Sequence, residues 1–175
     1  MALHGYVNTM HTMSWDVDAC NMAGVATTDL DNGVMVTLSK ANQDTKNVIK
    51  GFEYQVAPAQ ESSTQVWVVA SPEVGSTLEQ QLLADPRQFY NAKGKAMSIK
   101  ALVPGIDVIE VTKECFVSNT MPTTTTNKVK IGDNGKLVAA ATAPSDGAYF
   151  TFEGFHTVTI GMEEVQTAVL RCARN

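Results

Sequence analysis

Residues 65–111 read QVWVVASPEVGSTLEQQLLADPRQFYNAKGKAMSIKALVPGIDVIEV and carry the clearest structural signals of this 175-residue chain. The run 66–70 is short, apolar and β-branched, which favours a buried strand over a helix. Ser76 precedes a glutamate by three residues, the capping-box arrangement that begins a helix. Pro86 ends that helix, because the residue before a proline leaves the helical region. We therefore predict one short α-helix near residues 76–85.

The remainder of the chain favours strands joined by turns. Residues 97–102 and 106–112 have strand character around Pro104-Gly105, which predicts a hairpin. Asn-Gly pairs at 32–33 and 134–135 predict tight turns, because both residue types accept a positive φ. Many short strands with frequent turns and one helix predict a mainly β protein, either an antiparallel sandwich or one or more small β-barrels.

A threonine-rich stretch marks the best candidate boundary between parts of the chain. The sequence MPTTTTN occupies residues 121–127, between two regions of strand character. The predicted organisation is an N-terminal arm at 1–20, a β-rich domain with the helix at 21–119, a linker or loop at 120–127 and a C-terminal β subdomain at 128–175.

Composition excludes several classes of partner. Charged residues make up 18% of the chain and the net charge is −5, which argues against a basic groove for nucleic acid. No apolar window approaches the roughly 18 residues of a membrane span. The three cysteines are widely spaced and odd in number, so we expect reduced thiols rather than a disulfide framework or zinc site. The start of the chain lacks the pattern of a signal peptide, so synthesis in a cytoplasm is expected.

No catalytic motif is found in the sequence. The histidines, His4, His11 and His156, have no acidic or cysteine neighbour at a familiar catalytic spacing. Asp29 begins a stretch similar to a calcium loop, but the required glycine and glutamate at its sixth and twelfth positions are missing. We predict no catalytic, cofactor-binding or metal-binding site, and no enzymatic activity.

Two segments of the chain resemble accessory head proteins of tailed bacteriophages. Residues 68–74 (VVASPEV) and 89–96 (FYNAKGKA) are similar to the family's Ala-Ser-Pro-Glu-Val and Phe/Tyr-x-Asn-x-x-Gly-Lys segments. Residues 32–36 and 134–137 also fit its glycine-then-strand segments. The family's Gly-Asp hairpin pair reads Gly-Ile-Asp at 105–107, a departure of one residue.

The resemblance implies a capsid decoration or cement protein, made in the bacterial host cytoplasm and located on the virion's outer capsid surface. Its partner would be the major capsid protein, and it would form a homo-oligomer, trimers being common at threefold positions. An N-terminal arm and the loop after the first buried strand would supply the capsid or subunit contacts. Deleting residues 1–15 is then expected to weaken binding and leave the fold intact. The contact residues predicted on this basis are Leu3, Tyr6, Met10, Met13, Trp15, Ser71, Pro72 and Glu73.

Two other functions remain open at this stage. Head–tail connectors and tail-tube subunits are also small, acidic and rich in strands. A small ligand-binding barrel or enzyme would need His156 or Asp107 in a pocket with convergent polar groups.

Overall fold

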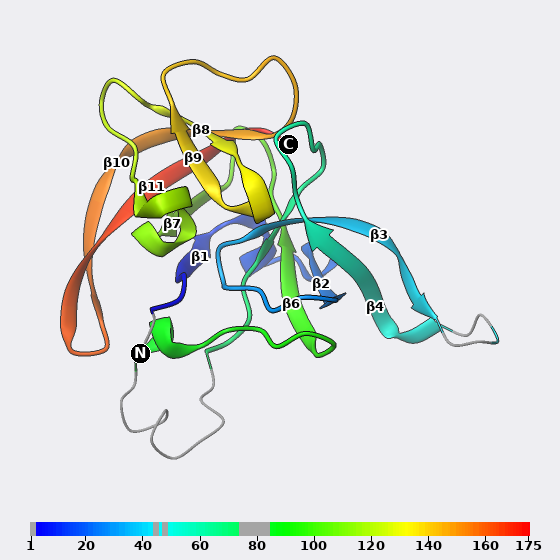
Figure 1. The fold of residues 1–175 in the computed structure, drawn as a ribbon. Helices are drawn as coiled ribbons and strands as arrows, with labels where there is room; N and C mark the ends of the chain where they lie inside the picture. The colour runs from blue at the N-terminus through cyan, green and yellow to red at the C-terminus, as the bar shows by residue number, and fades with distance from the viewer. Residues whose placement is uncertain (1–2, 44–45, 47–48, 74–84) are drawn as a thin grey trace.

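The computed structural model describes residues 3–43, 46, 49–73 and 85–175. Its strands form a closed five-stranded barrel and a six-stranded sheet packed against it (Figure 1). The predicted mainly β class is confirmed, while the predicted helix near 76–85 lies outside the described residues except for Asp85. Helical segments in the described ranges are three-residue 3₁₀ turns. They are η1 (Met13–Trp15), η2 (Asp18–Cys20), η3 (Pro86–Gln88), η4 (Lys113–Cys115), η5 (Val117–Asn119) and η6 (Asp133–Gly135).

The barrel has the strand order β2-β4-β3-β5-β6 and closes through the antiparallel pair β2–β6. The β2–β4 pair is parallel, and the other barrel pairs are antiparallel. Closure leaves no free strand edge around this body. The barrel strands are β2 (Asn21–Ala26), β3 (Met35–Gln43), β4 (Ile49–Pro58), β5 (Trp67–Val69) and β6 (Ala96–Ala101).

The second sheet has the order β1-β7-β11-β10-β8-β9, and its neighbouring strands are all antiparallel. Its two longest strands, β10 and β11, form a hairpin that extends beyond the rest of the sheet (Figure 1). The sheet strands are β1 (Val7–His11), β7 (Val108–Val111), β8 (Lys128–Ile131), β9 (Leu137–Ala140), β10 (Tyr149–Ile160) and β11 (Glu163–Arg174).

Strands from distant parts of the sequence share this sheet. The predicted arm at 1–20 contributes β1, which pairs with β7. The strand β7 in turn pairs with β11, across the predicted linker at 120–127. Strand pairing therefore groups the N-terminal strand with residues 108–174, and the barrel is built from the intervening residues 21–101.

The predicted hairpin of residues 97–102 and 106–112 is wrong. Both segments are strands, but β6 pairs with β2 and β5 in the barrel, whereas β7 pairs with β1 and β11 in the sheet. Barrel closure uses both edges of β6, so the chain crosses from the barrel to the sheet at the Pro104-Gly105 turn. By contrast, the hairpin predicted around residues 133–135 is confirmed, since β8 pairs with β9 there.

Two hydrophobic cores share the wall formed by β3 and β5. Met35 and Val68 point into the core between barrel and sheet, together with Phe116, Phe150 and Leu170. Their chain neighbours Val36 and Val69 point into the barrel interior. Alternate residues of a strand face opposite sides, so the continuous apolar run at 66–70 reflects burial on both faces.

Substituting the shared wall tests its contribution to stability. Met35 has no exposed surface, and Met35→Ala should lower the free energy of unfolding by about 2–5 kcal/mol through lost burial and cavity formation. Met162 is 97% exposed, so Met162→Ala should change the free energy of unfolding by less than about 0.5 kcal/mol when it is measured at low protein concentration. Urea unfolding of both variants measures the difference. Similar values for the two would contradict the shared-core description.

Candidate interaction surface

Three of the predicted N-terminal contact residues, Met10, Met13 and Trp15, lie at the β1 edge of the sheet. Met10 is in β1 and is 59% exposed, and Met13 and Trp15 bound the turn η1 that follows it. Trp15 is 58% exposed, which is unusual for so large an apolar side chain. The segment that carries these residues is thus ordered by the pairing of β1 with β7, while its apolar side chains face solvent.

A buried carboxylate fixes the position of this segment. Asp107 has no exposed surface, and its Oδ1 accepts a hydrogen bond of 2.8 Å from the backbone N–H of Met13. Its Oδ2 accepts one of 2.7 Å from the N–H of Val103. Ile106, the residue before Asp107, is 58% exposed. The carboxylate therefore brings Ile106 close to η1. We call Met10, Met13, Trp15 and Ile106 the apolar surface.

A lysine holds the Trp15 ring in place. The ammonium of Lys100 lies 5.8 Å from the centroid of the Trp15 ring, within the range of a cation–π contact. The same Nζ donates a 2.9 Å hydrogen bond to Oγ1 of Thr9. Burial lowers the pKa of Lys100. Because these contacts already orient the indole, its binding to a partner would cost little ordering entropy.

Leu3 lies by a different part of the molecule, and Tyr6 is held beside the end of β7 by hydrogen bonds with Thr112. The backbone N–H of His4, next to Leu3, donates to the carbonyl of Arg87, and the His4 ring packs 5.2 Å from that of Tyr90. Tyr6 is partly buried, and burial raises its pKa. Leu3 is 42% exposed. The predicted set of N-terminal residues is therefore divided between two regions.

The loop predicted to contact the capsid is largely occupied by internal hydrogen bonds. Ser71 is 8% exposed, and its Oγ accepts a 2.9 Å bond from the N–H of Ser98. Glu73 Oε1 accepts a 2.9 Å bond from Nδ2 of Asn32. Pro72 is exposed. Of these three predicted residues, only Pro72 presents a mainly exposed side chain.

Asn32 is the centre of this internal network and was not singled out by the sequence. Its side chain is fully buried and makes four hydrogen bonds. Nδ2 donates to the Ser71 carbonyl and to Glu73, and Oδ1 accepts from the Ser71 N–H and from Nδ2 of Asn91. The sequence signal was only that of a turn, because the same Asp-Asn-Gly tripeptide recurs at 133–135, where the asparagine is exposed.

The carboxyl of Glu73 couples this network to pH. Burial raises the pKa of Glu73, and the hydrogen bond from Asn32 opposes that shift. A carboxyl whose pKa is raised by folding contributes stability below its unfolded pKa, and that contribution is lost as the pH rises through the folded value. Glu73 therefore favours the folded state in acid.

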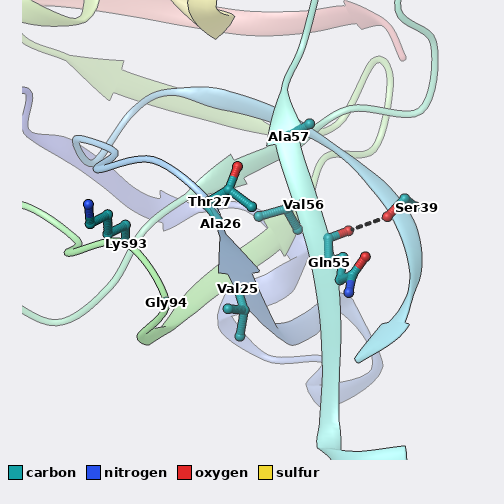
Figure 2. A pocket seen from close by; sticks show the side chains of 9 residues that line it. All are labelled: Val25, Ala26, Thr27, Ser39, Gln55, Val56, Ala57, Lys93 and Gly94. Atoms are coloured by element: carbon teal, nitrogen blue, oxygen red, sulfur yellow. Dashed lines mark hydrogen bonds between the residues drawn. The ribbon is translucent and has the colours of Figure 1, made fainter. Parts of the chain in front are cut away.

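A shallow pocket lies on the outer wall of the barrel. It has a volume of about 580 Å³ and includes the apolar residues Val25, Val56 and Ala57. Figure 2 shows Gln55 beside Ser39 on one side and Lys93 on the far side, its amine pointing away. The polar groups of the pocket do not converge on one point, as they do in sites specific for a small molecule.

The histidines are engaged mainly in structural pairs. His4 Nδ1 lies 2.7 Å from Oδ1 of Asp31, and His156 Nδ1 lies 3.0 Å from Oε2 of the buried Glu110. His11 is exposed on β1. Beside the second pair, the hydroxyl of Thr167 lies 3.1 Å from the His156 carbonyl oxygen, to which it donates, and 3.4 Å from Glu110 Oε2.

The buried cysteines are poor nucleophiles. Burial raises the pKa of Cys115 and of Cys172 to about 12, so both thiols stay protonated at neutral pH. In the ranges that the structure describes, no group of three or more His, Cys, Asp or Glu side chains could hold a metal ion. The same ranges contain no helix with the length and apolar character to cross a membrane.

Replacing Asn32 by aspartate tests the buried network. Asn32→Asp keeps the side-chain shape but turns an oxygen toward the Ser71 carbonyl and Glu73. Urea unfolding should show a loss of about 3–5 kcal/mol at pH 7, as for an unpaired buried charge, and a smaller loss at pH 4, where the new carboxyl is protonated.

Asn134→Asp is the matched control, because it lies in the same tripeptide but is exposed. Its effect should stay within about 0.5 kcal/mol at either pH. Equal losses at the two sites would show that Asn32 has no special role.

Comparison with protein-family models, curated proteins and solved structures finds no match to this chain.

Proposed function

We propose that this chain is a non-enzymatic structural protein of a tailed-phage virion, a decoration or cement protein that binds the outside of an icosahedral capsid. Two observations support the proposal. The first is the resemblance of segments 68–74 and 89–96 to accessory head proteins. The second is the exposed, pre-ordered apolar surface, which is the kind of feature that marks protein–protein contact sites.

The apolar surface is the observation that carries the proposal. Trp15 and Met10 are each more than half exposed, yet the carboxylate of Asp107 and the ammonium of Lys100 hold this part of the chain in place. Aromatic residues and methionine are enriched at binding interfaces, and tryptophan is prominent among residues that dominate binding energy. A rigid surface of this composition suits docking to another folded protein.

A repeated shell makes such a modest surface sufficient. Many identical sites lie close together on a capsid, and contacts made by an oligomer to neighbouring sites add as avidity rather than as separate weak events. A protein that covers joints between capsid subunits adds buried area across those joints. The major capsid protein is the expected partner, and the capsid surface is the expected location.

Serine substitutions test the apolar surface directly. Trp15→Ser and Ile106→Ser should each weaken binding to expanded capsids by roughly thirtyfold, which corresponds to about 2 kcal/mol for an interface anchor. Co-sedimentation of purified protein with capsids at graded concentrations measures the apparent Kd. Deleting residues 1–15 would remove β1 and its buried Val7, so the deletion should disturb the fold, contrary to the expectation from the sequence. Single substitutions avoid this effect.

Tyr90→Ser and Ile49→Ser are matched controls, since Tyr90 is 45% and Ile49 is 49% exposed outside the apolar surface. Both should bind like the wild type. If the wild-type protein fails to bind expanded capsids and is absent from virions by mass spectrometry, the proposal is wrong. Binding to purified tail or connector assemblies instead would assign the chain to another part of the virion.

A further inference from the structure

The β10–β11 hairpin ends in a protruding methionine. Ile160 pairs with Glu163, so Gly161 and Met162 form a two-residue turn, and Gly161 has a φ of +63° that such turns require. Met162 is 97% exposed, more than any other large apolar side chain among the described residues. The sequence therefore places an apolar side chain at the most prominent position of the hairpin.

The tip is anchored although its methionine is free. Ile160 is only 4% exposed. Arg87 Nη2 donates a 2.7 Å bond to Oε2 of Glu163, and the same guanidinium bonds both carboxylate oxygens of Asp85. Gly161 lies against Asp85 so closely that a Cβ there would be 3.3 Å from the Asp85 Cβ. A side chain displayed on an anchored tip is pre-organised for insertion into a partner.

The barrel pocket offers a complementary apolar recess. Val25 and Ala57 lie on the parallel pair β2–β4, and Gly94 leaves one side of the recess without a side chain. Val56 also borders the recess, but its side chain packs in the barrel core. Its volume of about 580 Å³ has room for a methionine side chain and part of the turn that carries it. Methionine fills irregular apolar spaces well, because its side chain is unbranched and flexible.

Charges of opposite sign surround the two features. Glu163 and Glu164 directly follow Met162, and Glu164 is exposed. Lys93 lines the pocket, and its ammonium forms no ion pair within the portion of the chain described by the structure. Asp29 lies beside Lys93 and accepts a hydrogen bond from its backbone N–H.

Further lysines reinforce the positive side. Lys95 follows the pocket residue Gly94, and Lys40 follows the pocket residue Ser39; both lysines are exposed. Complementary charges of this kind favour one orientation of approach and speed association.

We propose that Met162 of one copy of this chain inserts into the pocket beside Val25 and Ala57 of a second copy, with Glu164 facing Lys93. The hairpin tip and β4 lie on opposite sides of the molecule, so a chain cannot fill its own pocket (Figure 1). The contact joins two different surfaces and is head-to-tail, a geometry that forms a ring when the rotation between copies closes.

This contact is independent of capsid binding and is weak in solution. One side chain with its flanking charges buries far less than the roughly 1,200–2,000 Å² of a stable complex. Association should therefore appear only at high protein concentration. Display of many copies on one surface would strengthen it through effective concentration.

Analytical ultracentrifugation of the full chain over a range of concentrations tests the contact. The wild type should self-associate reversibly, and Met162→Asp should weaken association at least tenfold without changing the melting temperature. Ala57→Asp should do the same from the pocket side, and Lys93→Glu provides a second pocket variant whose side chain lies outside the core. Met10→Asp, at an exposed methionine on another surface, is the control and should associate like the wild type.

A mixing experiment identifies the head-to-tail arrangement. Met162→Asp retains an intact pocket and Ala57→Asp retains an intact tip, so their mixture should form a one-to-one dimer although each alone is monomeric. Charge reversal should act similarly. Glu164→Lys and Lys93→Glu each create a like-charge contact on their own, whereas their mixture pairs the new lysine of one variant with the new glutamate of the other. A wild type that stays monomeric at every concentration, an unaffected Met162→Asp variant, or a mixture that stays monomeric would each overturn the proposal.

Discussion

The side chain of Asn32 holds together the segments on which both cores depend. Its four hydrogen bonds connect the turn at 31–33 to the chain after β5 and to Asn91. Next to it, the N–H of Gly33 donates to the carbonyl of Val69, which fixes β5 against the start of β3. These two strands form the wall shared by the barrel and the sheet, with Met35 and Val36 facing opposite sides. A buried amide that satisfies all its partners at once allows little alternative packing, whereas losing one partner leaves polar atoms unpaired in the interior. The two bodies are therefore expected to behave as one stable unit.

Much of the fold could be predicted because period-2 patterns and turn residues are local signals. The buried strand at 66–70 and the hairpin around 133–135 follow from the local residue pattern alone. The pairing of β6 and β7 could not be predicted, because a turn signal does not say whether the strands beside it pair with each other or with distant strands. The two Asp-Asn-Gly tripeptides make the same point: Asn32 is buried and Asn134 is exposed, and only long-range contacts distinguish them.

The apolar surface was predictable only in part. An apolar N-terminal segment at Met10, Met13 and Trp15 is visible in the sequence, and these side chains are indeed substantially exposed. The contribution of Ile106 depends on a hydrogen bond from Met13 to Asp107, which spans 94 residues and leaves no local signature. Ser71 was predicted as a contact because it lies in the loop after the first buried strand, but its backbone is bonded to Asn32 inside the molecule. Exposed apolar side chains on a rigid frame are what the proposed function requires, and the frame is supplied by buried polar groups rather than by a larger hydrophobic core.

The proposed function is tested most directly by a cryo-electron microscopy map of the virus particle that carries this chain. The account predicts density for the barrel and six-stranded sheet on the outer face of the capsid, with Trp15 and Ile106 turned toward capsid subunits. Density for the chain in the tail or connector would contradict it, and so would a capsid-bound chain with these residues facing solvent.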